Sequence, residues 1–204
     1  MSIYIALIDA NNFYASCEEL IDPSLEGKPV VVLSNNDGCI ISRNSRARKL
    51  NIKMGQPYFK ISQKLKHLGV KVFSSNYPLY GDMSQRLMSL LKNYCDELEI
   101  YSIDEAFVKL NYLDQNKLTK WSYQLRALIY KNLGLPIAIG IGSNKVQAKI
   151  ANHLAKSLEK HAGIFNLTTE ENQDKYLNSV KVEDVWGIGR QIGHCCRAKG
   201  IKTA

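Results

Sequence analysis

No apolar run in the 204 residues approaches the roughly 18 residues that a membrane-spanning helix needs. The first residues also lack the basic segment followed by a long apolar stretch that marks a secretory signal. The five cysteines, at positions 17, 39, 95, 195 and 196, form no C-x-x-C pair and no spacing typical of a zinc site. We therefore expect a soluble, cytoplasmic protein whose thiols are reduced.

Acidic residues are in the minority, with 19 Asp and Glu against 27 Lys and Arg, so the formal net charge is +8. This excess suits a polyanionic partner such as DNA, although many basic proteins bind none. The length is sufficient for a substantial hydrophobic core and for one or two domains.

Three carboxylates stand out against this basic background. Asp9 closes the apolar run 3–8, and the adjacent Asp104 and Glu105 lie between apolar residues where a β-hairpin would place them. Acids that converge in this way repel each other unless a hard cation such as Mg²⁺ neutralises them. Two such ions about 3.5–4 Å apart would support phosphoryl or nucleotidyl transfer. The alternative is that these acids are turn residues and a strand-end cap, and spacing alone leaves both interpretations open.

Hydrophobic periodicity predicts alternating strands and helices. The run 3–8 is expected to be a buried strand that turns into a helix, with Asn11 or Asn12 as its cap. Strands 29–33 and 39–42 form a hairpin, and the middle of the chain follows the split βαβ pattern. Further strands are expected at 71–73, around 104–105 and at 136–142, and further helices at 59–68, 82–98, 116–133 and 145–160.

The apolar stripes of two helices predict their buried faces. In the helix at 82–98, the residues expected to point inward are Leu87, Leu90, Leu91 and Tyr94. In the helix at 145–160, they are Val146, Ile150, Leu154 and Leu158.

Two loops and a cluster of cations invite interpretations based on phosphate binding. Residues 43–49 hold four cations, which is typical either of a solvated helix face or of an element that binds a triphosphate. Residues 140–145 lack the spacing of a phosphate-binding loop, so they predict a tight strand-to-helix turn.

Residues 169–179 are polar and acidic, which indicates a linker. Residues 182–193 indicate a helix-hairpin-helix, in which glycines let backbone N–H groups approach a DNA phosphate.

Four segments together resemble the Y-family translesion DNA polymerases, and within them the UmuC type, the catalytic subunit of bacterial DNA polymerase V. They are IDANNFYASCEE at 8–19, SNNDGC at 34–39, SNY at 75–77 and YSIDEAF at 101–107. The resemblance implies an α+β fold with a ferredoxin-like polymerase palm, an inserted small fingers domain and a partial helical thumb. The implied boundaries are 1–13 and 80–168 for the palm, 14–79 for the fingers and 169–204 for the thumb.

The resemblance also implies a function and the residues that perform it. The function is template-directed, error-prone DNA synthesis past damaged bases in the SOS response, using two Mg²⁺ ions, a DNA primer-template and deoxynucleotides. Metal would be held by Asp9, Asp104, Glu105 and the Ala10 carbonyl. The implied nucleotide-binding residues are Phe13, Tyr14, Ser45, Arg48 and Lys156, with Tyr14 as a steric gate against ribose, and the implied DNA-binding residues are Gly187, Gly189 and Arg190.

Family members continue into a little finger and a clamp-binding peptide, which are not expected in a chain that ends at Ala204. A UmuD-type accessory subunit, a recombinase filament and a sliding clamp are implied as partners. The first alternative is a fragment or shortened protein that binds nucleotide or DNA weakly without turnover. The second is a cyclase-like palm enzyme, which should lack both the basic run at 43–49 and the helix-hairpin-helix.

Overall fold

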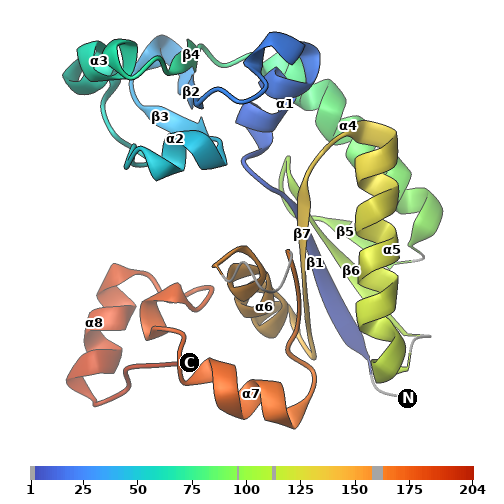
Figure 1. Ribbon diagram of the computed structural model, residues 1–204. Coiled ribbons are helices and arrows are strands. Elements are labelled where there is room, and N and C mark those ends of the chain that lie inside the picture. The colour runs from blue at the N-terminus through green and yellow to red at the C-terminus, as the bar shows by residue number, and fades with distance from the viewer. Residues whose placement is uncertain (1–2, 96, 112–113, 158–162) are drawn as a thin grey trace. The chain divides into compact units, whose positions relative to one another are not determined.

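The computed structural model describes residues 3–95, 97–111, 114–157 and 163–204. Its internal contacts divide the chain into two compact units. The first unit comprises residues 1–9, 88–132 and 137–204, and the second comprises residues 10–87 and 133–136. Figure 1 labels the helices and strands of both units.

The first unit is built on a five-stranded sheet with the order β5-β6-β1-β7-β8. Strand β1 pairs antiparallel with β6, β6 pairs antiparallel with β5, and β7 runs parallel to β8. The uninterrupted apolar run explains β1, because a central strand covered on both faces has no solvent-facing side for polar residues. The strands are β1 Tyr4–Ala10, β5 Glu97–Ile100, β6 Glu105–Leu110, β7 Ile137–Gly142 and β8 Ile164–Asn166.

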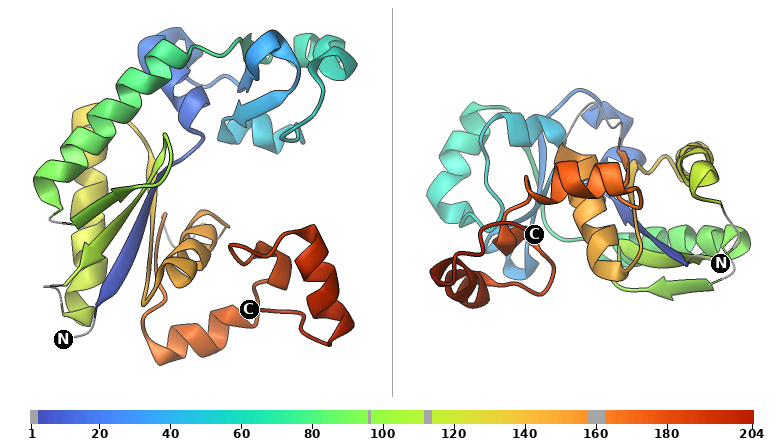
Figure 2. Two further views of the ribbon diagram at one scale, coloured as in Figure 1. Left: turned by 180° about the vertical axis from the view of Figure 1, so that it is seen from behind. Right: turned by 90° about the horizontal axis from the view of Figure 1, so that it is seen from below.

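Two long helices cover opposite faces of this sheet. Helix α5, Gln115–Leu133, runs along one face and helix α6, Lys145–Ser157, along the other (Figure 1; Figure 2, left). With helix α4, Tyr77–Tyr94, between the first two strands, the order β1, α4, β5, β6, α5 and β7 along the chain, together with the sheet order, is that of a ferredoxin-like split βαβ fold. The predicted α+β class is confirmed.

Glycines in β7 let α6 lie directly against the sheet. A Cβ atom at Gly140 would come within 2.1 Å of the Asn152 backbone nitrogen and 2.4 Å of the Ala148 carbonyl oxygen. A Cβ at Gly142 would lie 2.6 Å from the Ala148 nitrogen. The Gly-Ile-Gly segment therefore allows close packing of α6 on β7. The short connection from Gly142 to Lys145 agrees with the predicted tight turn.

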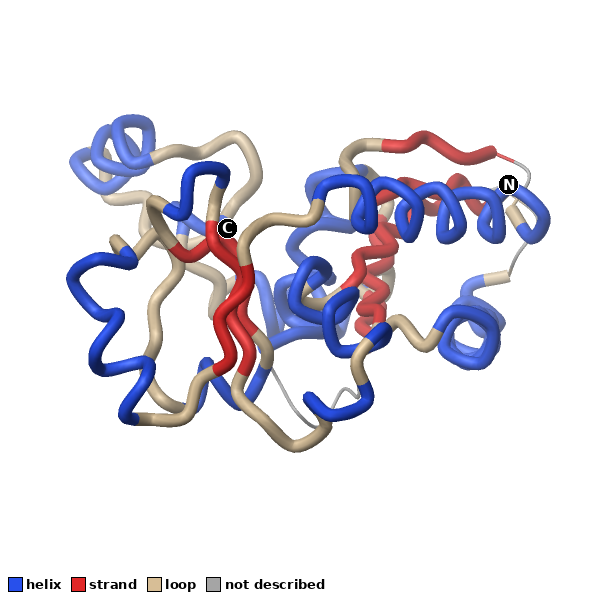
Figure 3. The backbone as a smooth tube through the Cα atoms, turned by 90° about the horizontal axis from the view of Figure 1, so that it is seen from above, coloured by secondary structure: helices blue, strands red, loops and turns tan. Residues whose placement is uncertain are grey.

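The second unit has a three-stranded sheet of order β3-β2-β4. Figure 3 shows its strands with α3 along one side. Its core includes Val31, Leu33, Ile40, Ile61 and Leu65. The strands are β2 Val30–Leu33, β3 Ile40–Arg43 and β4 Lys71–Phe73, and the helices are α1 Phe13–Ile21, α2 Ser45–Lys49, α3 Tyr58–His67 and part of α4 Tyr77–Tyr94, with 3₁₀ turns η1 Pro23–Leu25 and η2 Asn35–Asp37.

The predicted linker at 169–179 is wrong, because Glu170–Leu177 forms helix α7. The Thr169 hydroxyl caps this helix by accepting from the Asn172 backbone N–H at 3.3 Å. Two acidic residues in its first turn and Lys175 in its last turn also favour a helix. Tyr176 and Leu177 supply its apolar contacts to the core, so a polar composition concealed a short amphipathic helix.

The expected helix-hairpin-helix is only partly formed. Its first helix is a single 3₁₀ turn, η4 Val182–Asp184, and its second is α8, Arg190–Ala198. Gly187 has a φ of +91°, a conformation that favours glycine. Gly193 is buried where α8 meets η4, and a Cβ there would lie 2.6 Å from the Glu183 side chain.

Two predicted core positions are wrong. Tyr94 is 56% exposed and Val146 is 36% exposed. Met88 in α4 and Ala151 in α6 are buried instead, because the buried stripe of each helix is rotated about the helix axis from the predicted stripe. The expected inward residue Leu158 lies outside the described part of the chain.

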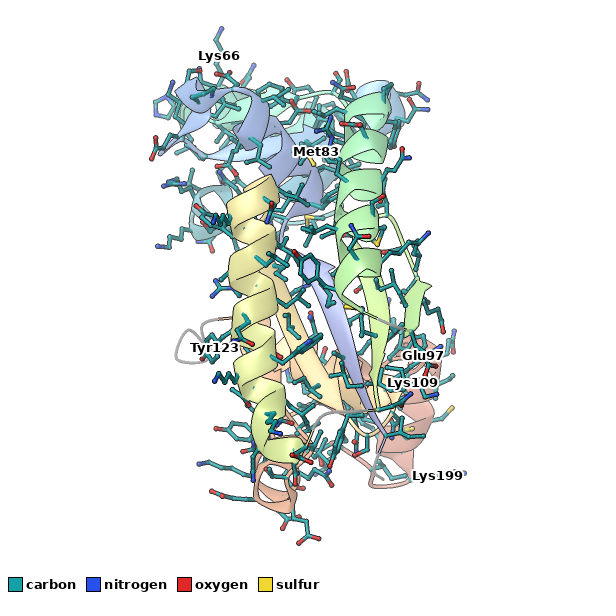
Figure 4. The ribbon with its side chains drawn as sticks, turned by 90° about the vertical axis from the view of Figure 1, so that its right-hand side faces the viewer. Lys66, Met83, Glu97, Lys109, Tyr123 and Lys199 are labelled. Carbon is teal, nitrogen blue, oxygen red and sulfur yellow. The ribbon has the colours of Figure 1, made fainter. Side chains whose placement is uncertain are left out.

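The outer strand of the larger sheet carries a surface ion pair. Glu97 and Lys109 face each other across β5 and β6, with 3.0 Å between Lys109 Nζ and Glu97 Oε2 (Figure 4). Pairs as exposed as this one contribute at most about 1 kcal/mol.

Within the described residues, no helix has the length and apolar character needed to cross a bilayer.

Candidate functional site

Asp9 and Glu105 face each other at the ends of two neighbouring strands. They are register partners in the antiparallel β1–β6 pair, and Asp9 is only 6% exposed. Asp104 immediately precedes β6, where its carboxylate accepts a hydrogen bond from the Ser102 hydroxyl at 2.7 Å. The structure thus brings two of the predicted acids together and places the third beside them in the chain.

Two lysines of α6 neutralise this carboxylate pair. Lys149 Nζ lies 2.9 Å from Glu105 Oε2 and 3.2 Å from Oε1, and Lys156 forms an ion pair with Asp9. The two lysines are seven residues apart, which places them on the same face of the helix. Lys156 was expected to contact a triphosphate, and here its partner is Asp9.

Burial raises the pKa of Asp9 to about 7, and the nearby Glu105 carboxylate adds to this rise. The ion pair with Lys156 opposes the shift but does not cancel it. Because the folded pKa lies above the ordinary value near 3.8, the folded protein binds more protons than the unfolded chain between these two values. Asp9 therefore stabilises the fold most at low pH, and its contribution is lost as the pH rises through about 7.

This shift predicts a measurable pH dependence. Replacing Asp9 with Asn should remove a fall in unfolding free energy that approaches about 1.4 kcal/mol per pH unit between pH 4 and 7. Urea denaturation of the wild type and of Asp9→Asn at several pH values would measure the difference. Parallel curves for the two proteins over this range would contradict the assignment.

Lys149 is further held by three aromatic rings. Its ammonium nitrogen lies 4.5 Å from the centroid of Tyr101, 5.5 Å from that of Trp186 and 6.0 Å from that of Phe107. Tyr101 and Trp186 are also in edge contact, with 5.6 Å between their centroids. Ring faces attract a cation, so they fix the lysine next to Glu105 without supplying a competing acid.

The donor atoms fit a hard divalent cation. Two opposed carboxylates and the carbonyl of Ala10, the last residue of β1, are oxygen ligands of the kind that Mg²⁺ prefers. Among the residues that the structure describes, no three His, Cys, Asp or Glu side chains lie close enough together to hold a metal. A cation would therefore have to take the oxygens that now face Lys149 and Lys156, with Asp104 turning from Ser102.

The second unit carries the other residues predicted to bind nucleotide. Arg48 and Ser45 are exposed on α2, and Arg48 donates to the Asn12 side-chain oxygen at 3.1 Å. Asn12 is the N-cap residue of α1, one of the two positions expected, but it is in a left-handed conformation and its side chain makes no capping hydrogen bond. Phe13 is 3% exposed and belongs to the core, whereas Tyr14 is half-buried.

Tyr14 lies in a cluster of rings. It stacks on Tyr80, with 4.4 Å between the centroids and 21° between the planes, and it meets Tyr77 edge-on at 6.3 Å. The fully buried Tyr80 donates its hydroxyl to the Glu18 carboxylate at 2.7 Å.

The C-terminal elements place the predicted DNA-binding residues at the surface. Gly187, Gly189 and Arg190 are all exposed. Gly189 is the residue before α8, and Gly187 has open space around its Cα. These positions are accessible to a phosphate backbone.

Sequence reasoning missed the roles of Lys149, Glu18 and Tyr80. The spacing of Lys149 and Lys156 was a usable signal, because residues seven apart on a helix share a face. The Glu18–Tyr80 contact had no such signal, since its two residues are 62 positions apart.

A ferredoxin-like sheet with opposed carboxylates at the ends of its central strands defines a polymerase-type palm. The model of the impB/mucB/samB family matches residues 8–153. The chain belongs to this family.

The comparisons also show how far the similarity to individual proteins extends. Protein UmuC of Salmonella typhimurium is 46% identical over 98% of this chain and 48% of its own length. DNA polymerase IV of Picrophilus torridus is 33% identical over 97% of this chain and 57% of its own. The structure of DinB from Sulfolobus solfataricus superposes with a TM-score of 0.84 at 27% identity, and the insertion ternary complex of Dbh DNA polymerase with 0.85 at 26%, each covering 98% of this chain and 58% of the other. The chain spans about half the length of the curated relatives that it matches.

Proposed function

We propose that this chain is the catalytic core of a template-directed DNA polymerase that copies past damaged bases in the cytoplasm during the SOS response. The observation that carries the proposal is the opposed pair of Asp9 and Glu105, set in a palm fold of a family whose relatives include DNA polymerases. The net charge of +8 suits a DNA substrate.

In this proposal, Asp9, Asp104, Glu105 and the Ala10 carbonyl hold two Mg²⁺ ions. Bound metal would supply activation of the primer 3′-hydroxyl and neutralise charge at the phosphates. The lysines of α6 keep the two carboxylates in place and neutralised until cations replace them. Lys156, once released from Asp9, becomes available to the triphosphate of an incoming nucleotide.

The second unit would bind the nucleotide. Arg48 is exposed and its guanidinium suits bidentate contacts to phosphate oxygens. Ser45 begins the same helix and would assist it. Tyr14 would exclude a ribose 2′-hydroxyl, and Phe13 would support Tyr14 from the core, since their ring centroids are 5.8 Å apart.

The C-terminal elements would hold DNA without regard to sequence. Backbone N–H groups near Gly187 and Gly189 would contact a phosphate, and Arg190 would add charge. A UmuD-type subunit, a recombinase filament and a sliding clamp complete the proposal as partners in the damage response, on the strength of the similarity to UmuC.

Primer extension tests the proposed function. A primer-template with each of the four bases at the templating position would be incubated with one deoxynucleotide at a time. Low salt is needed, because phosphate contacts weaken steeply as salt rises. We expect Mg²⁺-dependent incorporation that follows the templating base and stops with a chelator. Incorporation that ignores the template, or none at all, would contradict the proposal.

A second candidate is a module that binds nucleotide or DNA without turnover. It is favoured by one observation, the pairing of Glu105 and Asp9 with Lys149 and Lys156, which leaves both acids already neutralised. This candidate predicts nucleotide binding that is indifferent to Mg²⁺ and no incorporation, so the same assay with a fluorescent nucleotide separates the two.

A further inference from the structure

Tyr80, which stacks on Tyr14, and Glu18, which binds the Tyr80 hydroxyl, have no role in the proposed function. Tyr80 is fully buried, and Glu18 is 5% exposed. A buried carboxylate is costly unless a donor satisfies it, and here the Tyr80 hydroxyl does so at 2.7 Å. This pair is too deep for contact with substrate, so its effect must pass through a neighbour.

That neighbour is Tyr14. The rings of Tyr14 and Tyr80 are stacked at 4.4 Å, and Tyr77 stands edge-on to both, at 6.3 Å and 6.2 Å. Tyr14 and Glu18 are four residues apart in α1, and Tyr77 and Tyr80 are three apart in α4, so each helix presents its pair on one face. Helix α1 therefore carries both Tyr14 and Glu18, and the Glu18 carboxylate anchors the Tyr80 ring on which Tyr14 stacks.

The geometry restricts how Tyr14 can move. Rotating its ring away would break the stack with Tyr80, and Tyr77 closes a second side. Tyr80 cannot follow such a rotation without losing its hydrogen bond to Glu18 in a buried environment, which is unfavourable. Burial also raises the pKa of Tyr80, and the bond to Glu18 adds to the rise, so the hydroxyl remains a donor at neutral pH.

We propose that the Glu18–Tyr80 pair is a positioning device that holds the ring of Tyr14 and thereby sets how strictly the enzyme rejects ribonucleotides. This inference rests on the proposed role of Tyr14 as the gate against ribose. Sugar selectivity would then depend on Glu18 and Tyr80, which are buried and do not contact the sugar, as well as on the Tyr14 ring, which would contact it.

The test measures kcat/KM for a deoxynucleotide and for the matching ribonucleotide, and reports their ratio. Tyr80→Leu should reduce discrimination about tenfold, mainly by improving ribonucleotide use. Tyr80→Phe keeps the ring and loses only the hydroxyl, so its loss of discrimination should be smaller, about threefold. The matched control is Tyr94→Leu, which removes an exposed ring from the other end of α4.

A merely structural role predicts a different result, because lost stability lowers both rates together and leaves their ratio unchanged. If Tyr80→Leu folds poorly, the double variant Glu18→Leu/Tyr80→Phe removes both polar partners and keeps the stack, and should also relax discrimination. Unchanged ratios in Tyr80→Leu and in the double variant, beside a relaxed ratio in Tyr14→Ala, would overturn the inference while leaving the gate intact.

An unchanged ratio in Tyr14→Ala would show that the gate assignment is wrong, and the inference would fall with it. If the chain incorporates no nucleotide, the proposed function fails and a second readout decides whether the pair holds Tyr14. Fluorine NMR of 3-fluorotyrosine-labelled protein, with the Tyr14 signal assigned from Tyr14→Phe, should show that signal shifted and narrowed in Tyr80→Leu. A Tyr14 signal that does not change would overturn the positioning role.

Discussion

Replacing Asp104 with Ala should lower the rate of single-nucleotide incorporation about a thousandfold, with little change in stability. In the proposed mechanism, the variant loses a ligand of the metal ion, and it is this ion that would stabilise charge in the transition state. A thousandfold loss of rate corresponds to about 4 kcal/mol. Stability should change little because Asp104 is partly exposed before β6, with Ser102 as its hydrogen-bond partner. Rapid-quench incorporation and urea denaturation would measure the two effects separately.

The matched control is Glu97→Ala, which removes an exposed carboxylate from the outer strand of the same sheet. It should leave the incorporation rate within a factor of two, on the order of 0.4 kcal/mol. Asp9→Asn and Glu105→Gln should match the large loss seen with Asp104→Ala. Incorporation by Asp104→Ala at close to the wild-type rate would refute its assignment as a ligand.

The largest effect on stability is expected at Gly140. A Cβ atom there would lie 2.1 Å and 2.4 Å from backbone atoms of α6, distances that side-chain rotation cannot relieve. Helix α6 would have to move off β7, so Gly140→Ala should cost about 3 kcal/mol or more of unfolding free energy. The displacement would also move Lys156 away from the place where it is proposed to contact the triphosphate, so incorporation should fall as well.

Gly81→Ala is the matched control, since it adds the same methyl group to a glycine in α4 with nothing within 4 Å. It should be neutral or stabilising by up to about 1 kcal/mol, because alanine favours a helix. Both variants would be compared by urea denaturation monitored by circular dichroism. Equal stability of the two variants would show that α6 does not depend on close contact at Gly140.

Local patterns predicted most of the strands and helices, because burial on two faces or on one stripe imposes a period on the residues. The uninterrupted run before Asp9 is β1, and the β-branched run after Pro29 is β2. Helix α7 was missed because it has few apolar residues and depends on the Thr169 cap and contacts with distant parts of the core. Tyr94 was placed inward because a large apolar ring fits the stripe, although it is exposed.

The predicted site was partly accessible to the same reasoning. The carboxylates could be found because each ends or begins a strand, and the facing positions of Asp9 and Glu105 confirm that two of them converge. The spacing of Lys149 and Lys156 indicates that they share one face of α6. Their pairing with these acids could not be predicted, because Lys156 is 147 residues from Asp9 in the chain and only the packing of α6 on β7 brings them together. The same holds for Tyr80 and Glu18, whose contact depends on how α1 and α4 pack.

Binding of Mn²⁺, followed by loss of the electron paramagnetic resonance signal of the free ion and reversed by Mg²⁺, tests the central claim most directly. The claim is that Asp9 and Glu105 exchange their lysine partners for catalytic cations. Wild-type protein at pH 8 should bind Mn²⁺, Asp9→Asn and Glu105→Gln should each weaken binding at least about tenfold, and Glu97→Ala should bind like the wild type. Equal affinity in all four proteins would contradict the claim.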